Sequence, residues 1–139
     1  MKKIIPLCFT ALFFFFSCTD YKDKNNGVPE NDVDAASMFI RSALDGKWKD
    51  ARKLIVQDSA NIEDLEAAER VAERKGATDK RGYRESQITI HDTRKINDST
   101  SVIIYSNTFK KQKDSVKSVR VNGNWLVDLK YSFPNNQQQ

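Results

Sequence analysis

Residues 116–131 read VKSVRVNGNWLVDLKY, and they decide the fold because two alternating apolar and polar runs meet at Asn122 and Gly123. An Asn-Gly dipeptide between such runs favours a two-residue type I′ hairpin, in which both central residues take positive φ. The turn also sets the register of the two strands. The predicted pairs are Val121 with Asn124, Val119 with Leu126, Lys117 with Asp128, and Val116 with Leu129.

The alternation continues on the N-terminal side of this hairpin and predicts four strands, over residues 84–95, 99–109, 114–121 and 124–131. Loops at 97–98 and 110–113 then sort the sheet into two faces. The more apolar face should carry the helices, and comprises Ile88, Ile90, Ile103, Tyr105, Val116, Trp125, Val127, Leu129 and Tyr131. The outer face comprises His91, Thr93, Val102, Ile104, Lys117, Val119, Val121, Leu126 and Asp128.

Before residue 76 the apolar spacing is helical. A first helix begins at Asn31 or Asp32 and ends at Gly46, which suits a left-handed stop. A second covers 48–55, and a third runs from Asn61 or Ile62 to Lys75. The sequence therefore predicts one α+β domain over 32–133, with about three N-terminal helices packed on a curved, cone-like, four-stranded antiparallel β-meander.

The N-terminus has the pattern of an exported lipoprotein. Lys2 and Lys3 precede an uncharged apolar run over 4–16, which is typical of a signal peptide and short for a membrane span. Ser17 and Cys18 at the end of the run resemble a bacterial lipobox, although Phe15 stands where Leu is commonest. The resemblance implies cleavage after residue 17 and lipidation of Cys18, including palmitate. Residues 18–31 form a polar linker and 134–139 a polar tail, both expected to be disordered.

These features predict a location in the envelope of a Gram-negative bacterium, at the outer membrane, with the membrane as partner through the lipid. Without Lys2 and Lys3, the chain retains 21 basic and 19 acidic residues of the 23 and 19 in the full sequence. This balance does not predict nucleic-acid binding. Cys8 would leave with the leader, so the domain is stabilised by packing rather than by disulfides.

Two segments, LDGKWKDARKLI (44–55) and VRVNGNWLVDLKY (119–131), resemble small bacterial lipoproteins of the nuclear-transport-factor-2-like superfamily, which have a cystatin-like fold and include domains of unknown function. The resemblance covers most of 32–133. It implies a sheet that curls around the helices into a cone with a ligand pocket at its open end. It implies no reaction.

Three polar residues interrupt the helix-facing side of the predicted sheet: Asp92, Ser118 and Arg120. The predicted register places Asp92 opposite Ile103, and Ile103 opposite Arg120. A charge at such a position is costly unless it is paired or solvated. Our first hypothesis is that this cluster lines the mouth of the cone and binds a small ligand, with candidate residues Asp92, Tyr105, Ser118, Arg120 and Trp125. The alternative is a structural ion pair at a solvated sheet edge, which is the commoner situation.

The outer face supports a second hypothesis, in which Val102, Ile104, Val119, Val121 and Leu126 form an apolar patch for a homodimer or an envelope partner. Scattered surface apolarity is its alternative. A third hypothesis is a weak isomerase-like or hydrolase-like enzyme, with Asp92 as base and Tyr105 or Tyr131 as donor. We predict no catalytic residue, cofactor or metal site, because His91 is the only histidine and falls on the outer face. Asp-Ser pairs at 58, 98 and 114 fit turns or caps, with O-glycosylation as the alternative.

Overall fold

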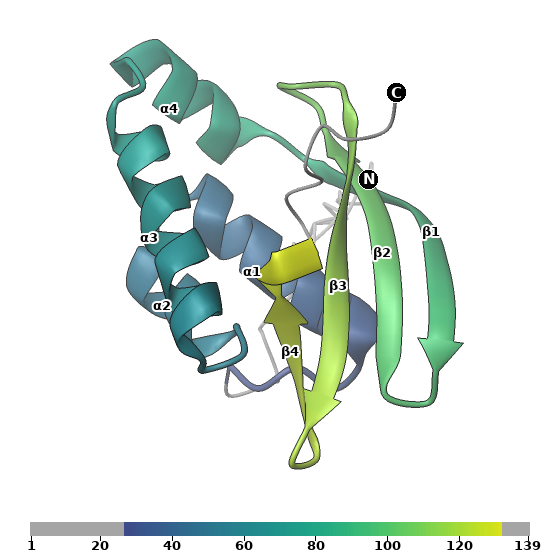
Figure 1. The fold of residues 1–139 in the computed structure, drawn as a ribbon. Coiled ribbons are helices and arrows are strands. Elements are labelled where there is room, and N and C mark those ends of the chain that lie inside the picture. The colour runs from purple at the N-terminus through teal and green to yellow at the C-terminus, as the bar shows by residue number, and fades with distance from the viewer. Residues whose placement is uncertain (1–26, 132–139) are drawn as a thin grey trace, which may run out of the picture.

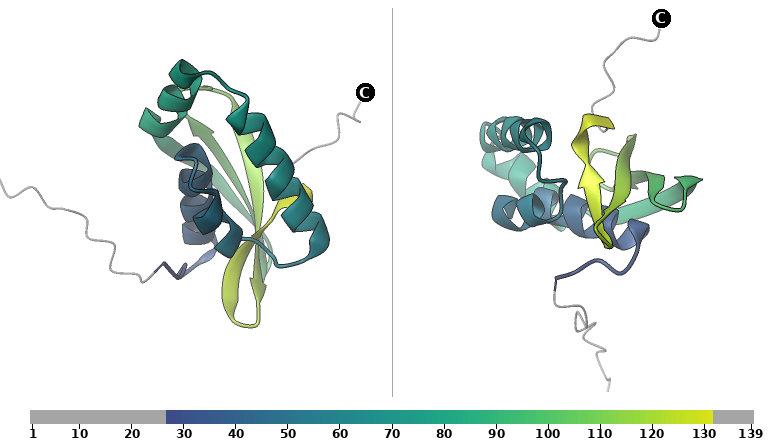
Figure 2. Two further views of the ribbon diagram at one scale, coloured as in Figure 1. Left: turned by 90° about the vertical axis from the view of Figure 1, so that its left-hand side faces the viewer. Right: turned by 60° about the horizontal axis from the view of Figure 1, so that its bottom comes forward.

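The computed structural model describes residues 27–131, and they form four helices and a four-stranded antiparallel sheet with strand order β1-β2-β3-β4. The predicted α+β fold class and the meander are therefore confirmed. The elements are α1 (Asp32–Leu44), α2 (Trp48–Lys53), α3 (Ser59–Glu73), α4 (Ala77–Glu85), β1 (Ile88–Asn97), β2 (Thr100–Asn107), β3 (Lys113–Val121), β4 (Asn124–Asp128) and a final 3₁₀ turn, Leu129–Tyr131. Figures 1 and 2 show the four helices on one side of the sheet.

Side-chain caps begin two of the helices. The side chain of Asn31 accepts a hydrogen bond of 2.9 Å from the Asp34 N–H and caps α1 as predicted. Asp58 caps α3, because its Oδ1 accepts a 2.8 Å bond from the Asn61 N–H. The predicted start of α3 at Asn61 or Ile62 is therefore late, since the polar residues before it already belong to the helix. Gly46, with φ of 72°, follows α1 as expected.

Helix α4 was not predicted, and the expected first strand from residue 84 overlaps its end. Its sequence ATDKRGYRE has few apolar residues, so it lacks the helical stripe that marks α1. Contacts with distant residues hold it instead. The ring of Phe109 lies against Gly82 so closely that a Cβ there would clash with it. Phe109 also packs edge-on against Tyr83, with centroids 4.8 Å apart.

The hairpin register is confirmed, because Val121 pairs with Asn124, Val119 with Leu126, and Lys117 with Asp128. Asn122 and Gly123 take positive φ of 50° and 84°, as a type I′ turn requires. The predicted pair of Val116 with Leu129 is wrong, since β4 ends at Asp128 and the chain continues as a 3₁₀ turn. This turn also leaves Tyr131 half exposed rather than on the helix-facing side.

The register between β2 and β3 differs from the prediction by four residues. The loop covers 108–112 rather than 110–113, and Ile103 pairs with Val116 instead of Arg120. Asn107 causes the early turn, because its Oδ1 accepts bonds from the N–H groups of Phe109 and Lys110 at 3.1 and 2.8 Å. The shift is an even number of residues, so each side chain stays on its predicted face.

Strand β1 contains an irregularity that places Asp92 on the opposite face of the sheet from the one predicted. Ile90 pairs with Tyr105, but the next pair joins Asp92 to Ile104, so His91 is an extra residue in a β-bulge. A second irregularity lies between Lys95 and Asn97. Beyond the first bulge, Thr93 rather than Asp92 stands opposite Ile103. The predicted placement of Asp92 on the helix-facing side is therefore wrong.

The core lies between the helices and the sheet. Buried residues of α1, α2, α3, the segment after α2, the three later strands and the final 3₁₀ turn form one cluster, which is Ala36, Phe39, Ile40, Ala51, Leu54, Ile55, Leu65, Ile103, Val116, Val127 and Leu129. Ile88, Ile90 and Tyr105 pack against it as predicted. The segment after α2 also runs beside β4, where the Val127 N–H donates to the Leu54 carbonyl at 2.8 Å and the Val56 N–H to the Val127 carbonyl at 2.9 Å.

Candidate functional site

The five candidate ligand-binding residues of the sheet do not come together. Asp92 is exposed and lies 3.3 Å from Arg94 in an ion pair on its own strand. It pairs with Ile104, whereas the Arg120 N–H donates to the carbonyl of Ser99, which immediately precedes β2. The bulge at His91 and the shifted β2–β3 register together separate the two charges.

Ser118 does face the helices, as predicted, but its hydroxyl is engaged. It is fully buried and donates a 2.8 Å bond to the backbone carbonyl of Asp32. The Ser101 hydroxyl donates to the carboxylate of the same Asp32. These two serines attach the start of α1 to the sheet, so the role of Ser118 is structural rather than ligand-binding.

Arg120 and Trp125 are neighbours across the β3–β4 hairpin, as the confirmed register requires. The Arg120 side chain is exposed and donates to the Gly123 carbonyl at 3.3 Å. Trp125 is half-buried beside it. This pair is far along the hairpin from Tyr105, which stands opposite Asp114 at the other end of β3.

Tyr105 lines a small cavity between the helices and the sheet. The cavity measures about 130 Å³, whereas sites for small molecules usually have about 300–1,000 Å³. Burial, and secondly the nearby Asp114 carboxylate, raise the pKa of Tyr105. The phenol therefore stays protonated at ordinary pH and offers a hydrogen-bond donor rather than a base.

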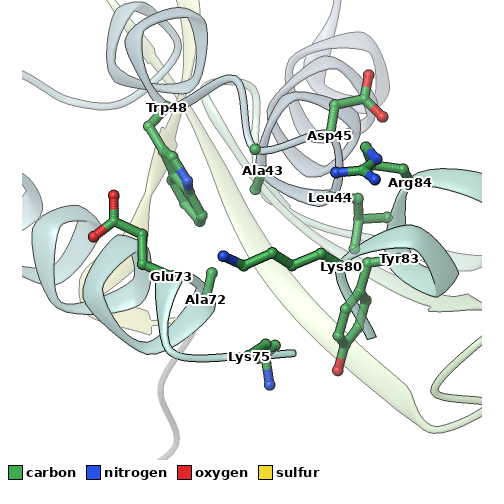
Figure 3. Close-up of a pocket in the computed structure, with 11 residues that line it drawn as sticks. Ala43, Leu44, Asp45, Trp48, Ala72, Glu73, Lys75, Lys80, Tyr83 and Arg84 are labelled. Carbon is green, nitrogen blue, oxygen red and sulfur yellow. The ribbon is translucent and has the colours of Figure 1, made fainter. Parts of the chain in front are cut away.

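A larger pocket, of about 410 Å³, lies among the helices near the C-terminal end of α1. Figure 3 shows its walls. The lining residues come from the end of α1, the start of α2, the end of α3, helix α4 and the turns between them, and are Ala43, Leu44, Asp45, Gly46, Trp48, Ala72, Glu73, Lys75, Lys80, Tyr83 and Arg84. None of them belongs to the predicted ligand-binding set.

Arg41 positions α4 and so completes this pocket. Its guanidinium donates bonds to three backbone carbonyls at the end of α4, those of Ser86 at 2.6 Å, Arg84 at 3.1 Å and Tyr83 at 3.2 Å. It also forms an ion pair of 2.8 Å with Asp45, at the end of α1. The last carbonyls of a helix have no partner within the helix, so a cation there satisfies them and suits the helix dipole.

Basic side chains dominate the polar part of the pocket. Lys80 and Arg84 belong to α4 and Lys75 to the turn before it, while Glu73 lies at the end of α3 and Asp45 lies after α1, beside Arg84 (Figure 3). Asp45 is already paired with Arg41 and with Lys47, at 2.8 and 3.2 Å. Among residues 27–131, neither Lys80 nor Arg84 has a carboxylate within 4.0 Å of its charged nitrogens. The pocket therefore presents net positive charge.

Trp48 links the two cavities, because it lines the pocket among the helices and also the small cavity beneath it. In Figure 3 its indole extends into the larger pocket, and Lys80 reaches across from α4 toward it. Both residues are half-buried. The Lys75 ammonium lies 5.3 Å from the centre of the Tyr83 ring, in cation–π geometry.

His91 is exposed on the outer face, as expected, with Nε2 2.8 Å from the Ser106 hydroxyl. Within the part of the chain that the structure describes, no three His, Cys, Asp or Glu side chains gather in a way that could hold a metal ion. None of the helices in 27–131 has the length and apolar character needed to cross a membrane. Cys18, the leader over 1–17 and the tail over 134–139 lie outside the described residues.

No helix from 27–131 covers the outer face of the sheet. Of the five residues of the predicted apolar patch, Val102 is buried, Ile104, Val119 and Leu126 are half-buried, and Val121 is 37% exposed. Their shared face is confirmed, but neighbouring side chains already cover most of their apolar surface. This makes the patch a weaker candidate site than the pocket among the helices.

No protein-family model and no curated protein sequence matches the chain. The fold is similar to the crystal structure of an NTF-2-like protein of unknown function from Shewanella oneidensis MR-1. The two share 12% sequence identity with a TM-score of 0.46, over 68% of this chain and 89% of that chain. This likeness concerns only the arrangement of helices and strands.

Proposed function

We propose that this chain is a lipid-anchored envelope protein whose α+β domain binds a small molecule in the pocket among its helices and does not catalyse a reaction. The observation that supports binding most directly is the 410 Å³ pocket with the half-buried Trp48 extending into it. Its size falls within the range of about 300–1,000 Å³ for small-molecule sites, which are lined mainly by apolar and aromatic groups.

The anchor is supported by the sequence alone. The basic start, the apolar run and Ser17-Cys18 together favour lipidation of Cys18. Each buried methylene of an attached acyl chain adds about 0.8 kcal/mol of membrane affinity, so several chains hold a protein stably. The proposed location is the outer membrane of a Gram-negative envelope, with the domain held close to the lipid by residues 18–31.

The geometry favours binding over catalysis. The predicted proton-transfer site needs its carboxylate within hydrogen-bond reach of the substrate and its donor aimed at the developing charge. Asp92, the predicted base, is exposed and stands beside Ile104 on the outer face, whereas Tyr105 faces the helices. These residues therefore do not support the enzyme hypothesis.

Two experiments test the two parts of the proposal separately. Metabolic labelling with a palmitate analogue should label the native chain but not Cys18→Ala, and an equal signal in both would refute the anchor. A thermal-shift screen of the full chain against small metabolites should give ligands that raise the melting temperature. Those shifts should disappear in Trp48→Ala and persist in Trp125→Ala, because Trp125 lies outside the pocket; equal shifts in both variants would refute the pocket.

A further inference from the structure

The pocket among the helices combines two kinds of recognition groups. Trp48 contributes a flat aromatic surface at one side, beside the small side chains of Ala43 and Ala72. Lys80 contributes an ammonium group that reaches across the pocket from α4. A ligand that satisfies both needs a flat apolar portion and a negative charge on the same small skeleton.

The charges around the pocket favour an anion over a cation. Residues 74–85 contain five basic and two acidic residues, and three of the basic ones, Lys75, Lys80 and Arg84, line the pocket. Of the two acids in the lining, Asp45 is held by Arg41 and Lys47. The Glu73 carboxylate points away from the tip of Lys80 (Figure 3).

Lys80 is the residue best placed to meet the anion. Its side chain is half-buried and lies beside apolar groups. A half-buried ammonium binds a carboxylate more strongly than an exposed one, because the surrounding dielectric is lower. Lys75 is less available, since its ammonium lies 5.3 Å from the Tyr83 ring centre, and Arg84 is exposed at the rim near Asp45.

We infer that the pocket binds a small aromatic carboxylic acid, with its ring against Trp48 and its carboxylate at Lys80. This inference rests on the proposed function and adds the chemical class of the ligand. A charge-assisted hydrogen bond to Lys80 would fix the orientation, while the indole and the alanines would supply the apolar contact.

Three probes that share one ring system test the inference. They are 2-naphthoate, 2-naphthalenemethanol and 2-naphthalenemethylamine, titrated calorimetrically into the full chain in lipid nanodiscs and corrected against empty nanodiscs. We expect 2-naphthoate to bind about tenfold or more tightly than the neutral alcohol, as one charged hydrogen bond implies, and the amine to bind most weakly. Equal affinity for all three would overturn the inference.

Lys80→Met keeps an unbranched side chain that is one atom shorter and removes its charge. This variant should weaken the binding of 2-naphthoate about tenfold and leave the affinity for 2-naphthalenemethanol unchanged. Lys49→Met is the matched control, because Lys49 is exposed on α2 and outside the pocket lining; it should change neither affinity. An unchanged 2-naphthoate affinity in Lys80→Met would refute the role of Lys80.

The indole N–H signals of Trp48 and Trp125 report where the probes bind. On ¹⁵N NMR spectra, with the Trp125→Phe variant for assignment, 2-naphthoate should shift the Trp48 signal and leave that of Trp125 in place. If the alcohol shifts Trp48 but 2-naphthoate does not, the pocket stands and the ligand class is wrong. If no probe shifts the Trp48 signal, the ligand class is refuted, whereas the pocket itself is refuted only if the thermal shifts of the metabolite screen are equal in Trp48→Ala and Trp125→Ala.

Discussion

The guanidinium of Arg41 donates a hydrogen bond of 2.6 Å to the backbone carbonyl of Ser86, joining residues 45 positions apart in the chain. Ser86 is buried and follows the last residue of α4. Two further carbonyls of α4 accept from the same guanidinium, and Asp45 pairs with it. One side chain thus attaches α4 to the end of α1, and the pocket lies between these two helices.

Replacing Arg41 by Met should detach α4 while leaving the core in place. The buried Ser86 carbonyl would lose its partner, at a cost of about 1–3 kcal/mol in the free energy of unfolding. Hydrogen exchange should therefore accelerate throughout 77–86 and remain slow in β2 and β3. Arg52→Met is the control, since Arg52 forms an exposed ion pair with Glu66 that contributes little. Uniform acceleration across the sheet would contradict this local role.

Asn61 connects α3 to the end of the sheet in a comparable way. Its side chain is fully buried, and its Oδ1 accepts a 2.6 Å bond from the Leu129 N–H while its Nδ2 donates to Asp58 at 3.0 Å. Asn61→Ala leaves a buried N–H unpaired, so we expect the free energy of unfolding to fall by about 2 kcal/mol. Urea titration measures this change. Asn124→Ala, at an exposed position, should alter stability by less than about 0.5 kcal/mol.

Much of the fold could be predicted because local signals agree with it. Asn122-Gly123 set a register that the structure reproduces, and the apolar spacing of α1 matches its buried face. The pocket could not be predicted, since it requires α4. That helix has almost no apolar stripe of its own, and depends on Arg41 and on the contact of Gly82 with Phe109, neither of which has a sequence pattern.

The predicted site failed for a related reason. A single extra residue, His91, turns Asp92 to the outer face, and a β-bulge of one residue leaves no distinct trace in an alternating run. Asn107 ended β2 early by capping the turn with its side chain, which moved Arg120 four residues along the sheet relative to Ile103. Local polar contacts thus determined which charges could meet.

The hairpin turn should tolerate substitution poorly at Gly123. Its φ of 84° is costly for any residue with a Cβ, by about 1–2 kcal/mol. We therefore expect Gly123→Ser to lower the free energy of unfolding by about 1 kcal/mol. Gly76→Ser is a matched control, because Gly76 caps α4 with φ of −65° and a Cβ there would meet no atom within 4 Å. Since serine caps helices well, that variant should be as stable as the native chain.

The ion pair between Asp58 and Lys130, at 2.7 Å, should make stability depend on pH in the acid range. The hydrogen bond from Lys130 has the largest effect and the bonds from Asn61 the next largest, and together they lower the pKa of Asp58 from 3.8 to about 2. A carboxyl whose pKa is lower in the folded state binds fewer protons there than in the unfolded state. Its contribution is therefore complete above about pH 4 and is lost as the pH falls toward 2.

Two variants separate the parts of this effect. Asp58→Asn retains a side-chain oxygen for the α3 cap but cannot ionise, so the difference in unfolding free energy from the native chain should be largest above pH 4 and shrink toward pH 2. Lys130→Met removes the hydrogen bond that lowers the pKa of Asp58 most and leaves the bonds from Asn61. Its pH profile should therefore lie between those of the native chain and Asp58→Asn. Urea titrations from pH 5 to pH 2 measure all three profiles. A difference that stays constant over this range would show that Asp58 acts only as a neutral cap, with no linkage between its ionisation and folding.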